Sequence, residues 1–519
     1  MDTSTARVRF WVVAAATAAP AGRRFAVNDD RFQQELSAAT AQVSVTVPDR
    51  LGPGPTRTIS IAFGKLRGFQ AASLPAAVPL LNSLKALAES PGSPESAAAK
   101  VRELVGEGPL AAAVASVAQE ASPAPAAPAS GAPLTADDLG LKTTAESAVD
   151  SFLRSIRPES KSGGAAPPPA DRVTRVRTVL QAAVEATARE ILATAPISRL
   201  ESTWRALRLL TEQCPASARI LVEVFDAEPA AAVELLEKEM PDEAFDRPDA
   251  IFIASPIADA ELAKKLAELG ESYNVPVVAD VAPELALGEA GMKADLEATP
   301  PPAVPEPWAA FRAEESSRWL SAAVNPVALL VEPGHTCLGS PAIAVAALLA
   351  QSFASTDGFG RIVGPGGALQ APATVPVDGG ATAPTQLFIS VARQTALAGR
   401  GLLTLGSTRG TDKVVLSSAP TARSSPDAVA LPGQIVTGRL VRFAQWVRDQ
   451  LPPTATEQDV VSMFGEAAQI FLFAGATGMG RVQAQLLPGE PRQIQVNAAL
   501  PAAHAGTPFQ IAFALPMRT

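Results

Sequence analysis

The sequence predicts a mixed α/β fold with a parallel core, a small α/β module at the N-terminus and a β-hairpin tail at the C-terminus. Between residues 219 and 280, three continuous apolar runs alternate with two amphipathic helical patterns. Such alternation favours a parallel βαβαβ core with right-handed crossovers. Two later runs alternate apolar and polar residues with a period of two, which predicts antiparallel strands. The core elements are residues 219–225, 229–239, 251–254, 259–272 and 275–280, and the tail strands are residues 493–500 and 509–515.

Composition favours a large assembly subunit and argues against a nucleic-acid-binding protein. The 519 residues are too many for one core, and charged residues make up only 18% of the chain. A net charge of -9 does not supply the concentrated Lys and Arg that nucleic acid requires. Two cysteines, Cys214 and Cys337, are too few for a disulfide framework or a zinc site, which favours a cytoplasmic location. No apolar run reaches the roughly 20 residues of a membrane-spanning helix, so membrane insertion is not expected.

Three segments rich in Pro, Ala and Gly interrupt the periodic patterns, at residues 121–133, 160–170 and 298–307. Such composition cannot build a core and is typical of linkers and loops. The expected organisation is a small module at 1–117, a linker at 118–135, a helical segment at 136–195 with a second linker at 160–170, an α/β body at 196–480 and C-terminal strands at 481–519.

The small module begins with the apolar run at residues 8–13, which includes Val8, Phe10 and Val12. We interpret this run as a buried first strand. The alternative is a short signal peptide, since Arg7 and Arg9 precede an Ala-rich apolar stretch. Asn28, Asp29 and Asp30 then cap a short helix, and two alternating strands follow. Leu81 and Leu84 lie on the apolar stripe of a later helix. The order is therefore strand, helix, strand pair, helix.

A core helix is predicted at residues 196–210. Leu200, Trp204 and Leu207 fall at i, i+4 and i+7, so they share one apolar stripe. Glu201 and Arg205 stand four residues apart on a neighbouring face and can form an ion pair. Periodicity alone predicts that this helix is structural.

The string RLESTWRAL at residues 199–207 closely resembles the RLE-x-x-WRGL helix of the large sheath protein of bacterial type VI secretion systems, with Ala206 in place of Gly. A second run is similar to the W-x-x-F/L-R-x-S/E-E-D-S-R-Y segment of that family. Residues 1 to about 115 resemble the small sheath protein of the same system, and residues from about 135 to 519 resemble the large one. The matching residues are Trp308, Arg312, Glu314, Glu315, Ser317 and Arg318 for the large protein, and Asp29, Asp30, Phe32, Phe63, Phe69, Leu81 and Leu84 for the small one.

This resemblance implies a fused, type VI-like sheath subunit that polymerises with copies of itself into a helical tube and is not an enzyme. It implies an inner tube protein, a baseplate and an AAA+ unfoldase as partners, and no cofactor, metal or nucleic acid. Two departures weaken the transfer. The chain begins directly at the first strand, and the segment at 134–158 is short where the family carries its unfoldase-binding helix, although Asp137, Asp138, Leu139 and a helical pattern at 145–156 remain.

The resemblance also implies that terminal strands link neighbouring subunits through main-chain pairing. An isolated apolar hairpin is marginal alone and presents an edge for such pairing. The alternative is that the hairpin completes the chain's own sheet. The residues expected on the interface strands are Val8, Phe10, Val12, Ile494, Val496, Phe509, Ile511, Phe513 and Leu515.

Two other functions stay open on the sequence alone, a non-contracting tube or shell of the same fold and a soluble nucleotide-dependent α/β enzyme. The two histidines, His335 and His504, lie far apart in loop-like sequence, so they favour no zinc site or Cys-His pair. The glycine-rich run at 475–482 has phosphate-loop spacing, but Arg481 and Val482 replace the Lys and Ser/Thr that hold phosphate and Mg²⁺. The loops at 358–367 and 401–408 also lack a nucleotide-binding pattern.

Overall fold

A computed structural model describes residues 7–119, 171–289, 291–292, 303–377, 380–472, 480–489 and 491–518. The chain forms two compact units. One comprises Met1–Glu35 together with Leu200–Thr519, and the other comprises Leu36–Arg199. This division differs from the expected one, because the first strand belongs to the same unit as the α/β body and not to a separate module at 1–117. The second linker, the helical pattern at 145–156 and Asp137–Leu139 lie outside the described residues.

The smaller unit combines a strand pair with helices. β3 and β4 are antiparallel, with Val45 opposite Ile59, and their exposed faces carry hydroxyl pairs such as Ser44 with Ser60. The rings of Phe63 and Phe69 stack at 4.1 Å between centroids, and α6 packs against α2 and α4. The elements that lie within this unit are β3 (Val43–Pro48), β4 (Thr56–Ile61), η2 (Leu66–Phe69), η3 (Leu74–Ala77), α2 (Pro79–Glu89), α3 (Pro94–Val105), α4 (Pro109–Gln119) and α6 (Arg172–Leu192). Two further helices, α1 (Asp29–Ala39) and α7 (Ala195–Glu212), extend across the unit boundaries in sequence.

The larger unit is built on a seven-stranded sheet with the order β14-β8-β7-β6-β1-β5-β2. All neighbouring strands are parallel except β2, which is antiparallel to β5. This confirms the predicted mixed α/β fold with a parallel core. The strands are β1 (Val8–Ala14), β2 (Arg23–Val27), β5 (Ile220–Asp226), β6 (Ala250–Ile257), β7 (Val277–Val281), β8 (Leu320–Val324) and β14 (Leu402–Thr404).

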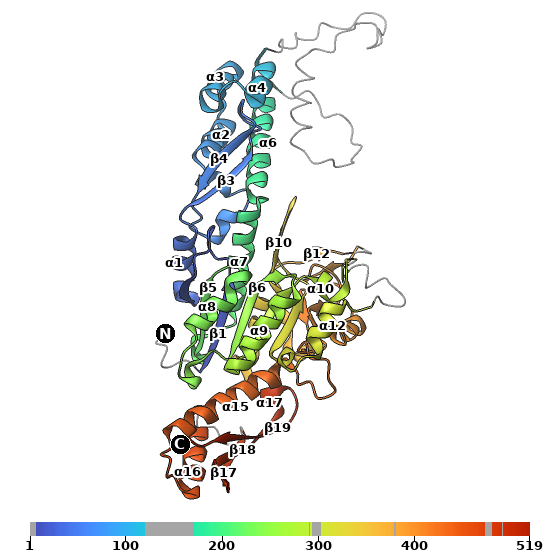
Figure 1. Ribbon diagram of the computed structural model, residues 1–519. Helices are drawn as coiled ribbons and strands as arrows, with labels where there is room; N and C mark the ends of the chain where they lie inside the picture. Colours follow the sequence, from blue (N-terminus) through green and yellow to red (C-terminus); the bar gives the residue numbers. More distant parts are fainter. Residues whose placement is uncertain are drawn as a thin grey trace, which may run out of the picture. The chain divides into compact units, whose positions relative to one another are not determined.

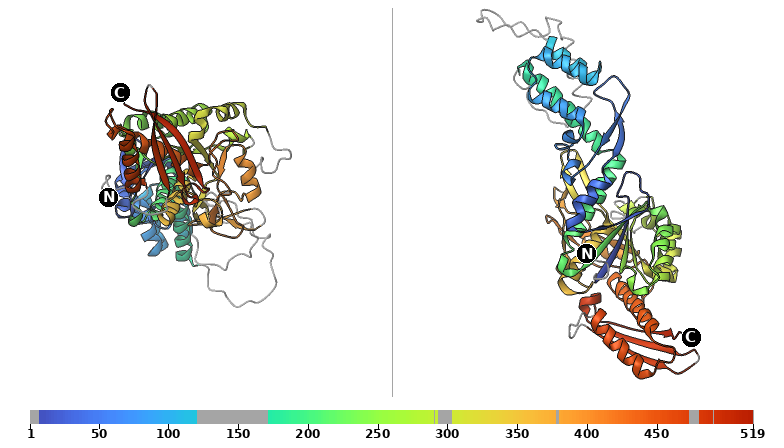
Figure 2. Two further views of the ribbon diagram at one scale, coloured as in Figure 1. Left: turned by 90° about the horizontal axis from the view of Figure 1, so that it is seen from below. Right: turned by 90° about the vertical axis from the view of Figure 1, so that its left-hand side faces the viewer.

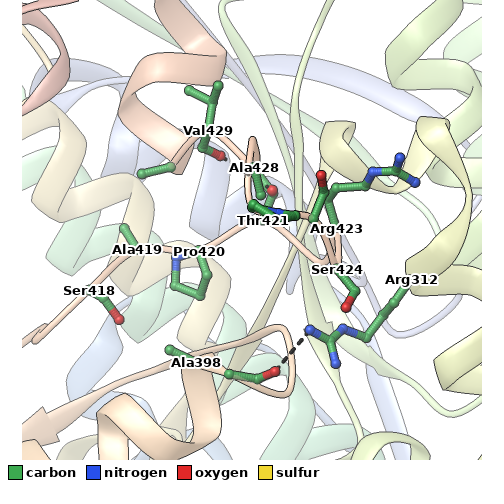
Figure 3. A pocket seen from close by; sticks show the side chains of 14 residues that line it. Arg312, Ala398, Ser418, Ala419, Pro420, Thr421, Arg423, Ser424, Ala428 and Val429 are labelled. Atoms are coloured by element: carbon green, nitrogen blue, oxygen red, sulfur yellow. Dashed lines mark hydrogen bonds between the residues drawn. The ribbon is translucent and has the colours of Figure 1, made fainter.

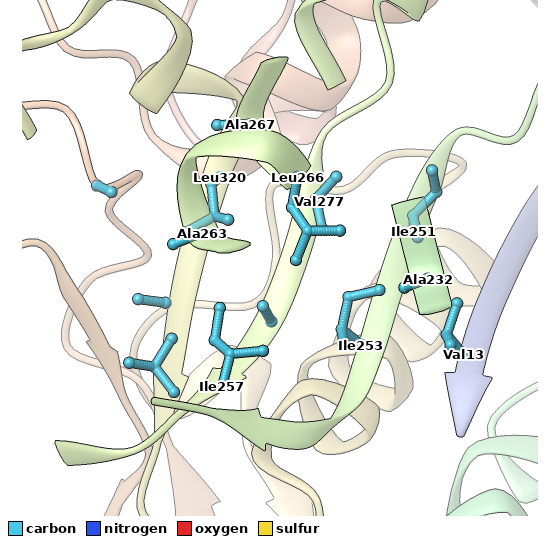
Figure 4. Packing of buried hydrophobic residues seen from close by; sticks show 14 of the residues in the cluster. Val13, Ala232, Ile251, Ile253, Ile257, Ala263, Leu266, Ala267, Val277 and Leu320 are labelled. Atoms are coloured by element: carbon cyan, nitrogen blue, oxygen red, sulfur yellow. The ribbon is translucent and has the colours of Figure 1, made fainter. Parts of the chain in front are cut away.

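Helices cover both faces of this sheet, which explains why its strands read as continuous apolar runs. On one face, Val13, Ile251, Ile253 and Val277 pack against α8 and α9 in a single apolar cluster (Figure 4). On the other face, the ring of Phe10 meets that of Phe252 at 5.2 Å, and the apolar helix α13 covers β6, β7 and β8. The helices of this region are α8 (Ala232–Glu239), α9 (Ala260–Tyr273), α10 (Pro283–Leu287), α12 (Glu306–Ala313), α13 (Pro341–Thr356) and α14 (Val391–Ala398), with 3-10 turns η4 (Ala216–Ala218), η5 (Pro229–Ala231), η6 (Ala244–Asp246), η7 (Glu315–Trp319) and η8 (Pro365–Gly367).

Helix ends in this core follow local sequence. The Asp259 side chain accepts a hydrogen bond from the Glu261 amide at the start of α9, and Asn274 ends the helix in the left-handed conformation with φ 57°. Short antiparallel pairs surround the sheet. They are β9 (Val327–Glu332) with β10 (His335–Gly339), β11 (Leu369–Gln370) with β16 (Lys413–Val415) and β15 (Gly406–Ser407), and β12 (Val375–Pro376) with β13 (Thr382–Ala383).

The C-terminal part of the larger unit consists of helices and a separate antiparallel sheet (Figures 1 and 2). α15 is fixed to the parallel sheet because the buried Arg442 guanidinium donates to Asp249 Oδ1 at 3.0 Å and to the backbone oxygen of Asn274. The elements are α15 (Leu431–Gln450), α16 (Glu457–Ala467), the π-helical turn η9 (Ala468–Leu472), β17 (Arg481–Leu487), β18 (Gln493–Leu500), α17 (Ala502–Ala505) and β19 (Phe509–Pro516). Among the described residues, no helix is long and apolar enough to cross a membrane.

Candidate assembly surface

The C-terminal sheet has the strand order β17-β18-β19, so the tail forms three strands where the sequence predicted two. β18 is the central strand. The expected interface residues of β18 and β19 lie directly opposite one another, with Ile494 opposite Leu515 and Val496 opposite Phe513. Their period-two spacing therefore places them on one face of the sheet, as the sequence pattern predicts for alternating strands.

Burial on this apolar face falls from the central strand to β19. Ile494 and Val496 are 0% and 1% exposed, whereas Phe509, Ile511 and Phe513 are only half-buried. Within the described residues, β17 and β19 each pair with β18 alone, so each keeps one open edge. An open edge strand with partly covered apolar side chains is a template for pairing with another chain.

The tail is anchored to its own chain by the loop between β18 and β19. The backbone amides of Phe359 and Gly360 donate to His504 and Ala503 at 3.1 and 3.0 Å. A side chain at Gly358 would overlap the backbone oxygen of Ala503, so this close approach requires glycine. The start of the glycine-rich loop, residues 358–360, thus packs against the tail.

Arg492 provides a second anchor at the base of the sheet. Its guanidinium donates to the backbone oxygens of Pro453 and Ala455, at 3.1 and 2.8 Å, in the connection between α15 and α16. Its own backbone oxygen accepts from Met517 at 2.8 Å. α16 packs against β17, and α15 contacts β19. The alternative interpretation of the tail, that it completes a sheet of its own chain, therefore describes β17 and β18 well, while no described residue pairs with the outer edge of β19.

The opposite face of the tail sheet is polar and nearly uncharged. Gln483 lies opposite Asn497, Asn497 lies opposite Ala512, and the Gln485 side chain donates to Gln495 at 2.5 Å. A shallow depression of about 390 Å³ crosses the three strands here, with Arg481 as its charged lining residue.

The structure corrects the expectation that Val8, Phe10 and Val12 belong to a strand between subunits. β1 pairs with β5 from Val8 to Ala14 and with β6 from Phe10 to Val13, so both of its edges are used within the chain. All three side chains are 0% exposed. A strand with two partners and two covered faces has no surface to offer to another subunit.

The expected core helix lies within α7, where Leu200, Trp204 and Leu207 are each 0% exposed. The indole nitrogen of Trp204 donates to the backbone oxygen of Ala16 at 2.9 Å. Its ring stacks near Phe25, at 6.0 Å, and meets Phe32 edge-on at 5.6 Å. The Trp204 ring therefore packs against Phe25, Phe32 and the chain segment that follows β1. Neither face of the ring is open to a stacked ligand.

The Glu201–Arg205 ion pair predicted from helical spacing is present beside this stripe, but the sequence did not reveal that the pair is buried and also binds His335. Glu201 is 0% exposed, and its carboxylate accepts from Arg205 Nε at 2.7 Å and lies 2.7 Å from His335 Nε2. The hydrogen bond to Glu201 raises the pKa of His335. Ser202 also donates to the backbone oxygen of Leu338 at 2.6 Å. The β9–β10 hairpin is thus held against α7 by two polar contacts, which only the fold brings together.

The other chemically suggestive residues do not form a catalytic arrangement among the described residues. Burial raises the pKa of both Cys214 and Cys337 to about 12, which disfavours a reactive thiolate. Burial also raises the pKa of Asp280 to about 7, and its carboxylate accepts from the Ala342 amide at 2.6 Å at the start of α13. The first part of the phosphate-loop-like run lies outside the described residues, and Arg481 and Val482 begin strand β17. No group of three metal-ligating side chains converges in the part of the chain that the structure describes.

The chain is thus a mixed α/β protein with a doubly covered parallel sheet and a separate antiparallel tail sheet. No protein-family model matches it, and no curated protein matches its sequence. Among solved structures, it is similar to the contracted helical sheath of the anti-feeding prophage, with a TM-score of 0.34 and 12% identity over 60% of this chain and 78% of that one. It is also similar to the contracted PVC sheath complex of an extracellular contractile injection system, with a TM-score of 0.35 and 12% identity over 61% and 77% of the two chains. A sheath tail protein from Desulfitobacterium hafniense gives a TM-score of 0.32 and 10% identity over 56% and 59%.

Proposed function

We propose that this chain is a structural subunit that assembles with copies of itself into the helical tubular sheath of a type VI-like contractile injection machine. The observation that carries the proposal is the outer edge of β19, which is unpaired among the described residues and flanked by the half-buried Phe509, Ile511 and Phe513. The collinear sheath-like motifs of the sequence support the same function.

Pairing at this edge suits a polymer whose subunits move. Main-chain hydrogen bonds along a strand give affinity without depending on one side chain, and alternate apolar side chains add specificity. The tail sheet is held to the rest of the unit through α15, α16 and the 358–360 loop, so a strand added to β19 would connect one subunit body to the next. The partners we propose are an inner tube protein and a baseplate, with an AAA+ unfoldase as a further candidate, and the proposed location is the cytoplasm.

The experiment places a lysine on either the apolar or the polar face of β19 and compares the polymers that the two variants form. Ile511 is half-buried on the apolar face, and Gln510 is exposed on the opposite face of the same strand. Because an inward-pointing charge on an edge strand blocks further pairing, we expect Ile511→Lys to abolish polymers seen by negative-stain electron microscopy. Gln510→Lys should leave them intact.

Circular dichroism and thermal unfolding must first show that both variants are folded. This design is sharper than removing the tail, since deletion of β18 would also expose the core between the sheet and α16. Polymers of unchanged form in folded Ile511→Lys would refute the role of β19. Tubes that keep one length and diameter under every condition would favour the alternative, a non-contracting tube or shell.

A further inference from the structure

A cavity of about 550 Å³ in the larger unit has no lining residue in the tail sheet (Figure 3). Its walls are the end of α14, the segment at 418–430 that leads into α15, and Arg312 of α12. Most lining residues are small or carry hydroxyl groups, including Ser418, Thr421 and Ser424. The cavity therefore combines one buried cation with several potential hydrogen-bond donors.

Arg312 is only 8% exposed, and its guanidinium is fixed at two points. Nε donates to the backbone oxygen of Ala422 at 2.9 Å, and Nη2 donates to that of Gly399 at 3.0 Å. Gly401 has φ +80°, and a side chain there would press on Arg312 Nε, so glycine leaves room for this arrangement. The third nitrogen, Nη1, has no hydrogen-bond partner among the described residues.

The charge of Arg312 is also uncompensated. No carboxylate of the described residues lies within ion-pair distance of it, and burial lowers its pKa, which expresses the cost of keeping the charged form out of water. Two other arginines of this unit do have a carboxylate partner. Arg442 is more deeply buried but is paired with Asp249, and Arg423, on the wall of the same cavity, pairs with Glu315 Oε2 at 2.9 Å.

The buried guanidinium of Arg312 binds only neutral carbonyl groups. A buried charge normally needs a partner of opposite charge to offset the cost of leaving water, and Arg312 has none among the described residues. Its planar fork matches the geometry of phosphate and carboxylate groups. We propose that this cavity is a binding site for a small oxyanion, with Arg312 as its charged anchor and the hydroxyl groups of Ser418 and Ser424 as further donors. The ligand class is inorganic phosphate or a small phosphorylated or carboxylated molecule, and the site is independent of the assembly edge on β19.

The test is isothermal titration calorimetry of the full chain with inorganic phosphate, at an ionic strength kept constant with chloride. We expect one saturable site. Loss of a charged hydrogen-bond donor is worth roughly a factor of 10 or more in affinity, so Arg312→Gln should weaken phosphate binding by at least that factor. Arg318→Gln removes a more exposed arginine that pairs with Glu315 outside the cavity lining, and should leave the affinity unchanged.

A second variant keeps the proposal testable if Arg312→Gln does not fold. Ser424→Asp adds a carboxylate to the cavity wall, which supplies an internal counter-charge. It should abolish phosphate binding while the melting temperature stays equal to or above that of the unmodified chain without phosphate. Absence of a saturable heat for the unmodified chain, or phosphate binding that survives Ser424→Asp, would overturn the proposal.

Discussion

At the residue scale, buried charges in this molecule join secondary-structure elements that are distant in sequence. Asp249, just before β6, accepts from the Arg9 amide at 3.0 Å and from Arg442 of α15. Glu201 of α7 binds Arg205 and His335. Each buried carboxylate has at least two hydrogen-bonding partners in the protein in place of the water that it loses on burial. Such partners offset the free-energy cost of burying a charge.

The cluster around Glu201 makes stability depend on pH. Relative to an ordinary value of 6.5, the pKa of His335 is raised by its hydrogen bond to Glu201 and by the charges of Glu201 and Glu332, while burial and Arg205 oppose the shift. A raised folded-state pKa means that the stabilisation is fully present below about 6.5 and is lost as the pH rises through the higher folded value.

We therefore expect the melting temperature of the unmodified chain to exceed that of His335→Gln at acidic pH. The difference should shrink as the pH rises through the folded pKa. Differential scanning calorimetry across this range measures it, and His504→Gln, which removes the other histidine, is the control. A difference that is independent of pH would show that His335 is not charged in the folded state.

At the element scale, α15 lies very close to the end of α9, where Gly438 meets the backbone of Asn274. A side chain at Gly438 would overlap the backbone oxygen of Asn274, the group that also accepts from Arg442. Gly438→Ala should therefore push the helix away and cost about 1–3 kcal/mol, as overpacking does elsewhere.

Gly465 is the matched control because it also lies within a helix, α16, and a side chain there would meet nothing within 4 Å. Gly465→Ala should stabilise the chain by roughly 0.5–1 kcal/mol, since alanine loses less backbone entropy in a helix. Thermal unfolding of the two variants tests the contrast. Equal melting temperatures would mean that the contact at Gly438 is not needed to seat α15.

At the scale of the whole molecule, the described residues before 120 and after 170 both contribute strands or helices to each compact unit. β1 from the first segment lies between β5 and β6 of the second, and α6 of the second segment packs against α2 and α4 of the first. Each compact unit thus contains chain from both sides of the first Pro-rich segment. Neither segment therefore has a complete core by itself.

Cutting the chain there should give an obligate pair. We expect residues 135–519 expressed alone to be insoluble, since their sheet would lack β1, which separates β5 from β6, and the edge strand β2. Co-expressed segments should purify as a stable 1:1 complex. Size-exclusion chromatography with light scattering measures the outcome.

Val12→Asp in the first segment, which places a charge in the β1 core position, should prevent co-purification, whereas Ser44→Asp on the exposed face of β3 should not. Two segments that purify separately as folded monomers would contradict the interdependence.

Local pattern in the sequence was enough to predict the class of fold and several of its elements. The parallel core follows from continuous apolar runs between amphipathic helices, because strands buried on both faces lack alternation. The common face of Ile494, Val496 and the β19 residues follows from their period of two, and the stripe of Leu200, Trp204 and Leu207 from helical spacing. These properties depend only on neighbours along the chain.

Only the tertiary structure determines which other segments each strand or helix packs against. No local signal states that β1 inserts between β5 and β6, because that pairing joins residues more than two hundred positions apart. For the same reason the sequence showed neither the burial of Glu201 against His335 nor the uncompensated charge of Arg312. Strand order and charge pairing arise when distant segments share one core, and the free energy of that core, not local periodicity, selects them.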